Sequence, residues 1–290
     1  MEKLDPRIHA YRADLADERL TDKVKAERYV PGDLSHVHRD SVPLFSEPSF
    51  DGELQTEALF GEVIRIFEIR DGWAWGQILT DDYVGYLPLE ALSPGLLEPT
   101  HRVSSLRTFV YEQANLKSPP IALISMMSPV TVNGRDGDFC ELADKGYIYH
   151  THLVPVDEVE ADFVAVAERF VGTPYLWGGR TSLGLDCSAL IQIGLLATGQ
   201  FSRRDSDLQA ASLGELLADT TDLSQLNRGD LVFWKGHIGV MVDEKQMLHS
   251  NAHHMAVAIE PLETAVQRIR SNGGGEITAL RRFSNYKGTS

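Results

Sequence analysis

One cysteine and two histidines of this chain lie in motifs that could together cleave an amide bond. Cys187 stands at the start of an apolar run, and His237 and His249 lie in two later segments with the patterns of strands. In acyl transfer a thiolate attacks a carbonyl carbon, and a histidine takes the thiol proton and returns it to the leaving amine. A third polar group orients that histidine. We therefore predict that Cys187 is the nucleophile, with His237 and His249 as candidates for the base and the orienting group.

The run after Cys187 predicts the helix that must hold the nucleophile. Apolar residues recur from Ser188 to Thr198 with the 3.6-residue period of a buried helix, and Gly199 follows as a stop. A thiol at the first turn of a helix meets unpaired N–H groups and the positive end of the helix dipole. We therefore expect a lowered pKa for the thiol of Cys187.

Two neighbouring strands are predicted to hold the histidines. Branched apolar residues alternate with other residues in 236–242, and His237 begins the opposite face of that strand. Residues 246–250 form a second strand, which carries His249, and 243–245 are suited to the turn between them. An antiparallel hairpin would bring the two imidazole rings side by side.

Several blocks around these residues resemble the NlpC-type family of bacterial cell-wall cysteine peptidases, which are papain-like. The resemblance spans about residues 158–262 and rests on four blocks: Thr173–Gly179, Asp186–Ser188, Gly229–Phe233 and His237–Val240. It implies that the catalytic residues are Cys187, His237 as the base and His249 as the orienting third residue. It also implies a thioester intermediate and no cofactor or metal. It also implies that the Tyr175 hydroxyl and the Cys187 amide stabilise the oxyanion.

Other residues that could do chemistry have simpler interpretations. Cys140 lies in a strand pattern without a histidine motif nearby, so we expect it to be structural. His253 and His254 are expected in a loop. Together with His249 they lack a recognisable ligand spacing and a nearby cysteine pair, so no metal site is predicted.

The pattern of the N-terminal half predicts two small β modules that are related by an internal sequence repeat. Short strand patterns are separated by Gly, Asp and Pro turns, and each module has an Arg-Asp-Gly turn, at 70–72 and at 135–137. The modules resemble bacterial SH3-like domains. We predict a multidomain α+β protein in which two SH3-like β barrels precede a papain-like peptidase. The predicted divisions are an N-terminal arm at 1–30, barrels at 31–97 and 98–156, and the peptidase at 157–290.

The net charge of the chain bears on its expected partners, and its first residues bear on its expected compartment. The chain has 27 basic and 42 acidic residues, a formal net charge of −15. Such a surface repels nucleic acid and anionic lipid, so neither is an expected partner. The first residues lack the apolar stretch of a secretory signal, and the sequence has no run of 18 apolar residues, so we expect a cytoplasmic protein.

Within the family, the chain resembles the γ-D-glutamyl-L-diamino acid endopeptidases of murein peptide recycling. Their substrate is a small murein peptide with a free L-Ala amine, and the resemblance implies an amine pocket built from Asp186, Ser188, Glu62 and Tyr83. Hydrolysis of intact peptidoglycan, an amidase or acyltransferase activity, and a non-catalytic binding module remain alternatives. The sequence leaves open the identity of the diamino acid, the oligomeric state and the role of the second barrel.

Overall fold

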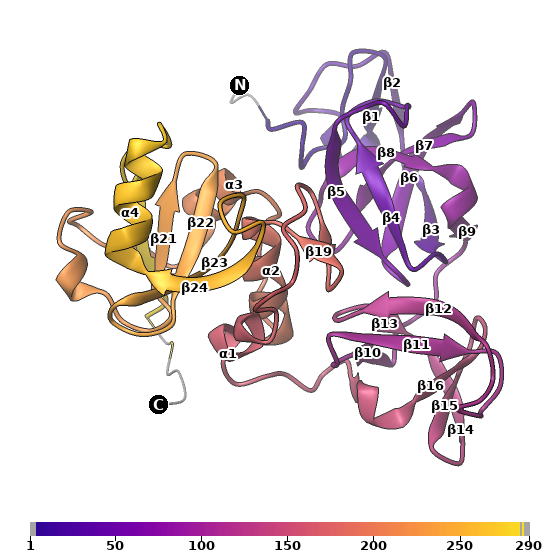
Figure 1. The fold of residues 1–290 in the computed structure, drawn as a ribbon. Helices are drawn as coiled ribbons and strands as arrows, with labels where there is room; N and C mark the ends of the chain where they lie inside the picture. Colours follow the sequence, from indigo (N-terminus) through magenta and orange to yellow (C-terminus); the bar gives the residue numbers. More distant parts are fainter. Residues whose placement is uncertain (1–3, 285, 287–290) are drawn as a thin grey trace. The chain divides into compact units, whose positions relative to one another are not determined.

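The chain folds into two compact units, Met1–Glu158 and Val159–Ser290. The computed structural model describes residues 4–284 and Tyr286 (Figure 1). The sequence-based boundary between the second barrel and the peptidase lay at residue 156. None of the described residues form a helix that is long and apolar enough to cross a membrane.

The first β module of the N-terminal unit is a seven-stranded sheet in the order β5-β4-β8-β7-β6-β3-β9. Its strands are β3 (Asp33–Val37), β4 (Ser41–Phe45), β5 (Leu54–Leu59), β6 (Val63–Arg70), β7 (Trp73–Ile78), β8 (Val84–Pro88) and β9 (Leu92–Pro94). The Arg-Asp-Gly motif turns β6 into β7, with positive φ at both Asp71 and Gly72. Two successive positive φ angles match the right-handed twist of a hairpin, which explains the glycine.

The N-terminal arm packs on this module. It contains the short strands β1 (Leu15–Asp17) and β2 (Arg28–Val30), which pair in parallel, with a 3₁₀ turn at Glu18–Leu20 between them. Leu15 is buried against Phe67 and Trp75 of the sheet. The arm therefore belongs to the N-terminal unit.

The second β module, like the first, has a core of buried apolar residues and an Arg-Asp-Gly hairpin turn. Its strands form two sheets, β12-β11-β16-β15-β14 and β13-β10-β17. They are β10 (His101–Val103), β11 (Arg107–Tyr111), β12 (Pro120–Ser125), β13 (Pro129–Val130), β14 (Val132–Asp136), β15 (Phe139–Leu142), β16 (Tyr147–Tyr149) and β17 (Leu153–Pro155). The second Arg-Asp-Gly motif joins β14 to β15, so both copies of the predicted repeat make hairpin turns.

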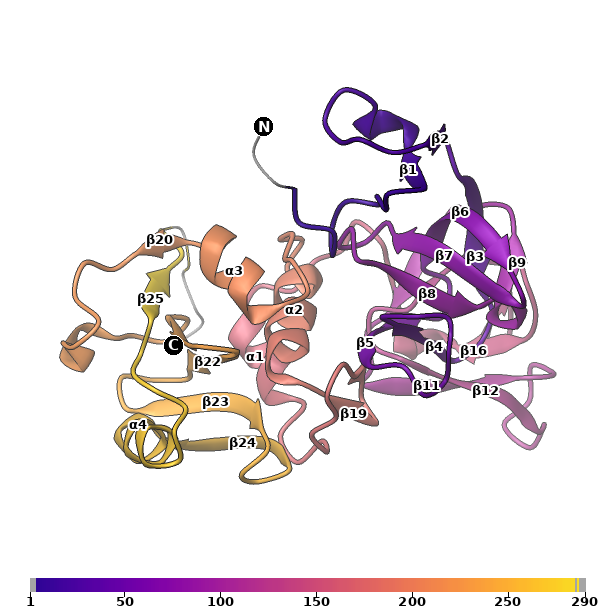
Figure 2. The same ribbon diagram turned by 90° about the horizontal axis from the view of Figure 1, so that it is seen from above.

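The C-terminal unit is built on one antiparallel sheet in the order β20-β25-β21-β22-β23-β24. The strands are β20 (Glu215–Leu216), β21 (Leu231–Trp234), β22 (His237–Met241), β23 (Gln246–Asn251), β24 (Ala256–Pro261) and β25 (Ala279–Arg282). The helices are α1 (Phe163–Glu168), α2 (Cys187–Ala197), α3 (Ser206–Ser212) and α4 (Leu262–Ser271), and β18 (Arg180–Thr181) and β19 (Gly184–Leu185) form a small hairpin. Figures 1 and 2 show α4 beside β23 and β24, and α1 packed against α2.

The elements predicted to hold the chemistry are present in this unit. Helix α2 starts at Cys187 and is followed by Gly199 with a φ of 74°, the left-handed conformation that ends many helices. Strands β22 and β23 form the expected antiparallel hairpin, with Val240 opposite Leu248. The prediction of a sheet-rich N-terminal region followed by an α+β unit is confirmed.

Candidate active site

Cys187, the predicted nucleophile, lies where the first turn of α2 meets the first residues of β22. The backbone amides of Ile238 and Ser188 lie close enough to Sγ of Cys187 to favour its thiolate form. Ile238 directly follows His237, so the sulfur sits beside the strand that carries the predicted base. The cysteine residue is only 8% exposed.

Burial decides the protonation state of Cys187. It raises the pKa of the thiol to about 12, and the nearby negative charge of Asp186 acts in the same direction. The two amide donors and the charge of Arg204 favour the thiolate, but they do not offset the loss of solvent. The expected lowering of the Cys187 pKa is therefore wrong, because the sequence shows a helix start but not how deeply it is buried.

The two histidines meet as the hairpin predicts. Nε2 of His237 lies 2.9 Å from Nδ1 of His249, and the ring centroids are 5.1 Å apart. Since this contact occupies Nε2, Nδ1 is the nitrogen of His237 that is left to take the proton of Cys187. The two histidines are thus paired in the way that a base and its orienting group require.

Both imidazoles are neutral near pH 7. Burial lowers the pKa of His237 to about 3, helped by the proximity of His249. Burial also lowers the pKa of His249, although its carboxylate partner Glu260 acts in the opposite direction. The resting pair is therefore a thiol and a neutral imidazole. In the predicted reaction, in which His237 is the base, the proton of Cys187 has to pass to His237 during attack on the substrate.

Two further residues extend the series of contacts and were not predicted from the sequence. Nε2 of His249 lies 2.7 Å from Oε1 of Glu260 on β24, and Arg268 of α4 approaches both oxygens of that carboxylate at 2.5 Å. Residues 256–261 alternate as a strand should, and β24 pairs residue by residue with β23. That alternation was the available signal that Glu260 shares a face with His249.

The same carboxylate belongs to a group of residues that could hold a metal ion. Ligand atoms of His249, His254 and Glu260 lie within 4.8 Å of one another. However, both ring nitrogens of His249 are engaged by His237 and Glu260, and Arg268 neutralises the carboxylate. A divalent cation would have to displace that guanidinium, so the donor set fits a hydrogen-bonded relay better than a metal centre.

Tyr175 lies near the nucleophile in the segment before β18. Its amide donates to the carbonyl of Met255 at 3.0 Å, and it bridges to Leu185. Burial and the adjacent Cys187 raise the pKa of the Tyr175 hydroxyl to about 12. The hydroxyl therefore stays protonated at neutral pH and can donate a hydrogen bond, as an oxyanion ligand must. Its role in the reaction remains a prediction.

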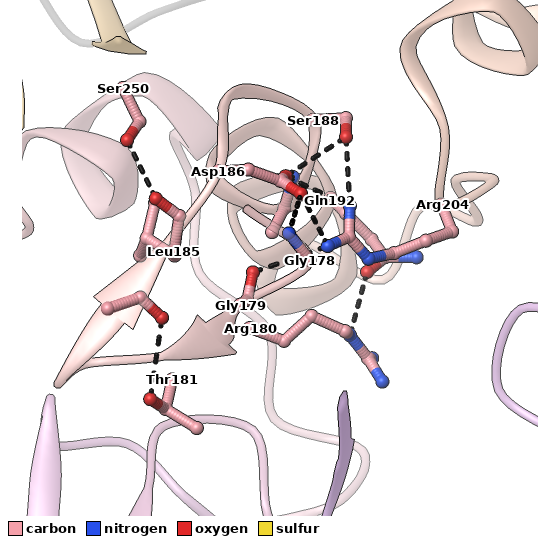
Figure 3. Close-up of polar contacts among 12 residues, drawn as sticks. Gly178, Gly179, Arg180, Thr181, Leu185, Asp186, Ser188, Gln192, Arg204 and Ser250 are labelled. Carbon is pink, nitrogen blue, oxygen red and sulfur yellow. Dashed lines mark hydrogen bonds and ion pairs between the residues drawn. The ribbon is translucent and has the colours of Figure 1, made fainter. Parts of the chain in front are cut away.

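Asp186 caps helix α2 and is surrounded by donors (Figure 3). Its carboxylate accepts from the amides of Gly178 and Ala189, from the hydroxyl of Ser188 and twice from the guanidinium of Arg204, at 2.7–3.1 Å. A carboxylate offers about four lone-pair sites, and five donors fill them. Asp186 thus positions the helix start, and its contacts disfavour the predicted role as acceptor of a substrate ammonium.

The other residues of the predicted amine pocket also have structural contacts. The Ser188 hydroxyl is buried between Asp186 and Arg204. In the N-terminal unit, the buried carboxylate of Glu62 accepts from the amide of Leu59 at 2.7 Å, and Tyr83 is 2% exposed in the hydrophobic core. Their contact with substrate remains a prediction.

The residues expected to be structural occupy such positions. Cys140 is buried in the core of the second β module. His253 and His254 lie in the turn between β23 and β24, and the ring of His254 is 6.4 Å from that of His249.

Comparisons with known proteins assign a domain to each of the two units. Residues 172–271 match the model described as the NlpC/P60 family, and residues 44–92 match the bacterial dipeptidyl-peptidase Sh3 domain. The C-terminal unit is an NlpC/P60 cysteine peptidase domain. The resemblance seen in the sequence is thereby confirmed, as is the SH3-like character of the first β module.

Curated relatives align with most of this chain. Dipeptidyl-peptidase 6 of Lysinibacillus sphaericus is 23% identical over 262 residues, which cover 82% of this chain and 94% of the relative. The gamma-D-glutamyl-L-lysine dipeptidyl-peptidase of Bacillus subtilis (strain 168) is 25% identical over 254 residues, which cover 80% and 82%.

A solved NlpC/P60 structure has the same fold. The NlpC/P60 family protein from Bacillus cereus superposes with a TM-score of 0.71 at 19% identity, over 86% of this chain and 99% of that one. The similarity includes the N-terminal region as well as the peptidase domain, so this order of domains also occurs in that protein.

Proposed function

We propose that this protein hydrolyses the bond between γ-D-glutamate and an L-diamino acid in small murein peptides. Cys187 attacks the γ-carbonyl, His237 takes the thiol proton at Nδ1 and returns it to the departing amine, and His249 orients His237. The acyl group is then bound to the protein as a thioester, and water releases it. The Cys187 amide and the Tyr175 hydroxyl bind the oxyanion.

One observation carries the peptidase chemistry. The hydrogen bond between His237 and His249, at 2.9 Å, leaves Nδ1 of the base for the nucleophile at the N-terminus of α2. The bond proposed for cleavage draws its support from the relatives named gamma-D-glutamyl-L-lysine dipeptidyl-peptidase. We take diaminopimelate as the first diamino acid to test, with lysine as the variant.

A free N-terminal L-Ala is part of the proposal. The relatives' dipeptidyl-peptidase names support it, since such enzymes release two residues from an amino end. The residue that would bind the substrate ammonium is not assigned, because Asp186, Ser188 and Glu62 all have protein partners.

We also propose that the activity belongs to peptide recycling in the cytoplasm. Cell fractionation with an antibody to the protein would test this location.

The same contacts favour one alternative. If the residues proposed for the amine pocket serve only the fold, the site has no reason to require a free amine, and intact peptidoglycan becomes a possible substrate. An amidase or acyltransferase would use the same nucleophile on a different acyl group.

Three substrates separate these possibilities. The protein is incubated with L-Ala-γ-D-Glu-meso-diaminopimelate, its N-acetylated form and purified sacculi, and products are followed by liquid chromatography with mass spectrometry. The proposal expects cleavage of the free-amine peptide alone. Equal cleavage of the acetylated peptide removes the amine requirement, and release of fragments from sacculi at a similar rate favours the wall hydrolase.

A further inference from the structure

The active site continues beyond its two histidines to a carboxylate and a guanidinium. His237, His249, Glu260 and Arg268 come from β22, β23, β24 and α4, and adjacent members lie 2.9, 2.7 and 2.5 Å apart. His249 and Glu260 are 1% and 7% exposed. Water therefore competes little for these hydrogen bonds, and each group depends on its neighbour.

The direction of the hydrogen bonds follows from the carboxylate. An ionised carboxylate only accepts, so Nε2 of His249 must carry the proton that faces Glu260. In a neutral imidazole the other nitrogen is then an acceptor, so Nδ1 of His249 receives the Nε2–H of His237. By the same rule, Nδ1 of His237 is unprotonated and offers a lone pair. Only this tautomer of His237 can accept the proton of Cys187.

Arg268 keeps the carboxylate in its accepting form. Its guanidinium donates to both oxygens of Glu260, and a guanidinium cannot lose its proton under ordinary conditions. With His249 it holds the pKa of Glu260 down to about 2 although burial acts in the opposite direction. Glu260 is therefore ionised throughout the pH range in which a peptidase works.

We propose that Glu260 is a positioning residue that fixes the tautomers of His249 and His237, leaving Nδ1 of His237 free for the thiol proton. Arg268 secures Glu260 as an ionised acceptor. The two residues act through the histidines and touch neither the substrate nor the sulfur. This inference rests on the proposed peptidase chemistry of Cys187 and is independent of which bond the protein cleaves.

Replacing Glu260 by leucine removes the acceptor that holds the proton of His249 on Nε2. Since Arg268 donates to both oxygens of that carboxylate, Arg268→Met is made in the same variant so that no unpaired cation is left. His249 can then also carry its proton on Nδ1, which makes Nε2 of His237 the acceptor and moves the proton of His237 to Nδ1. In those molecules the base is blocked on the side where Cys187 needs it.

The double variant Glu260→Leu, Arg268→Met should therefore lower kcat by at least about tenfold, with about 10⁴-fold, the loss that a wrong histidine tautomer causes in a related triad, as the upper bound, and with little change in KM. Arg268→Met alone keeps the accepting carboxylate and should lose less activity than the double variant. The exposed pair Glu263→Gln and Arg270→Met on α4 serves as the matched control and should keep wild-type kinetics.

Side-chain ¹⁵N NMR at pH 7 shows which ring nitrogen of each histidine carries the proton, and it needs no substrate. The wild-type protein should show a protonated Nε2 and an unprotonated Nδ1 for His249, assigned by loss of the signals in His249→Asn, and the double variant should show protonation at Nδ1 as well. The inference is overturned if wild-type His249 carries its proton on Nδ1, or if the double variant keeps the kcat of Arg268→Met alone. Because the NMR result needs no turnover, a failed activity assay with the murein peptide contradicts the proposed substrate instead.

Discussion

Arg204 donates two hydrogen bonds to Asp186, the residue immediately before the nucleophile, and both side chains are almost fully buried. The same guanidinium donates to the hydroxyl of Ser188, immediately after the nucleophile, and to the carbonyl of Gly179. The segment that carries Cys187 is thus fixed on both sides by one cation from the loop before α3.

Replacing Arg204 by methionine should destabilise the protein. The change keeps most of the apolar stem but leaves the carboxylate of Asp186 buried without its cation, which typically costs about 3–5 kcal/mol. Equilibrium denaturation with urea, followed by the fluorescence of the tryptophans, measures the loss. Arg203→Met is the neighbouring control, since Arg203 is partly exposed and stacks on Phe201. Equal stability of the two variants would contradict this role of Arg204.

Cys187→Ala should abolish hydrolysis while leaving the protein folded, because no other group of the site can form the thioester. Activity and the thermal unfolding midpoint are measured on the same sample. Cys140→Ala is the control and should keep its activity, since Cys140 lies in the second β module. Turnover by Cys187→Ala at the wild-type rate would contradict the assignment of the nucleophile.

His249→Asn should retain part of the activity, because an amide oxygen can still accept from Nε2 of His237. We expect a loss of about tenfold, equivalent to about 1.4 kcal/mol in the barrier. His249→Leu removes the acceptor and should cost about 10³-fold, within the usual range for acid–base groups. Steady-state kinetics of both variants test the difference. If leucine were tolerated as well as asparagine, His249 would have no orienting role.

The unliganded thiol should react slowly with iodoacetamide near neutral pH. Burial raises the pKa of Cys187 to about 12, so its thiolate fraction grows about tenfold for each pH unit in the range below that value. Alkylation of the peptide containing Cys187, followed by mass spectrometry between pH 6 and 9, should show a steady rise. A rate that is already constant below pH 7 would indicate a thiolate–imidazolium pair at rest.

Features that depend on neighbouring residues could be predicted from the sequence, whereas features that depend on contacts between distant residues could not. Local patterns sufficed for the helix after Cys187, the hairpin of β22 and β23, and both Arg-Asp-Gly turns, because each depends on neighbouring residues. Arg204 and Arg268 were missed because they meet Asp186 and Glu260 only through tertiary packing. The pKa direction of Cys187 failed for the same reason, since burial is set by distant segments.

The most direct test of the account is the cleavage of L-Ala-γ-D-Glu-meso-diaminopimelate compared with its isomer linked through the α-carboxyl group. Release of meso-diaminopimelate is followed by mass spectrometry for the wild-type protein and for Cys187→Ala. The account predicts release from the γ-linked peptide by the wild-type protein alone, with L-Ala-D-Glu as the other product. Lack of release from the γ-linked peptide, or equal release from both isomers, would contradict it.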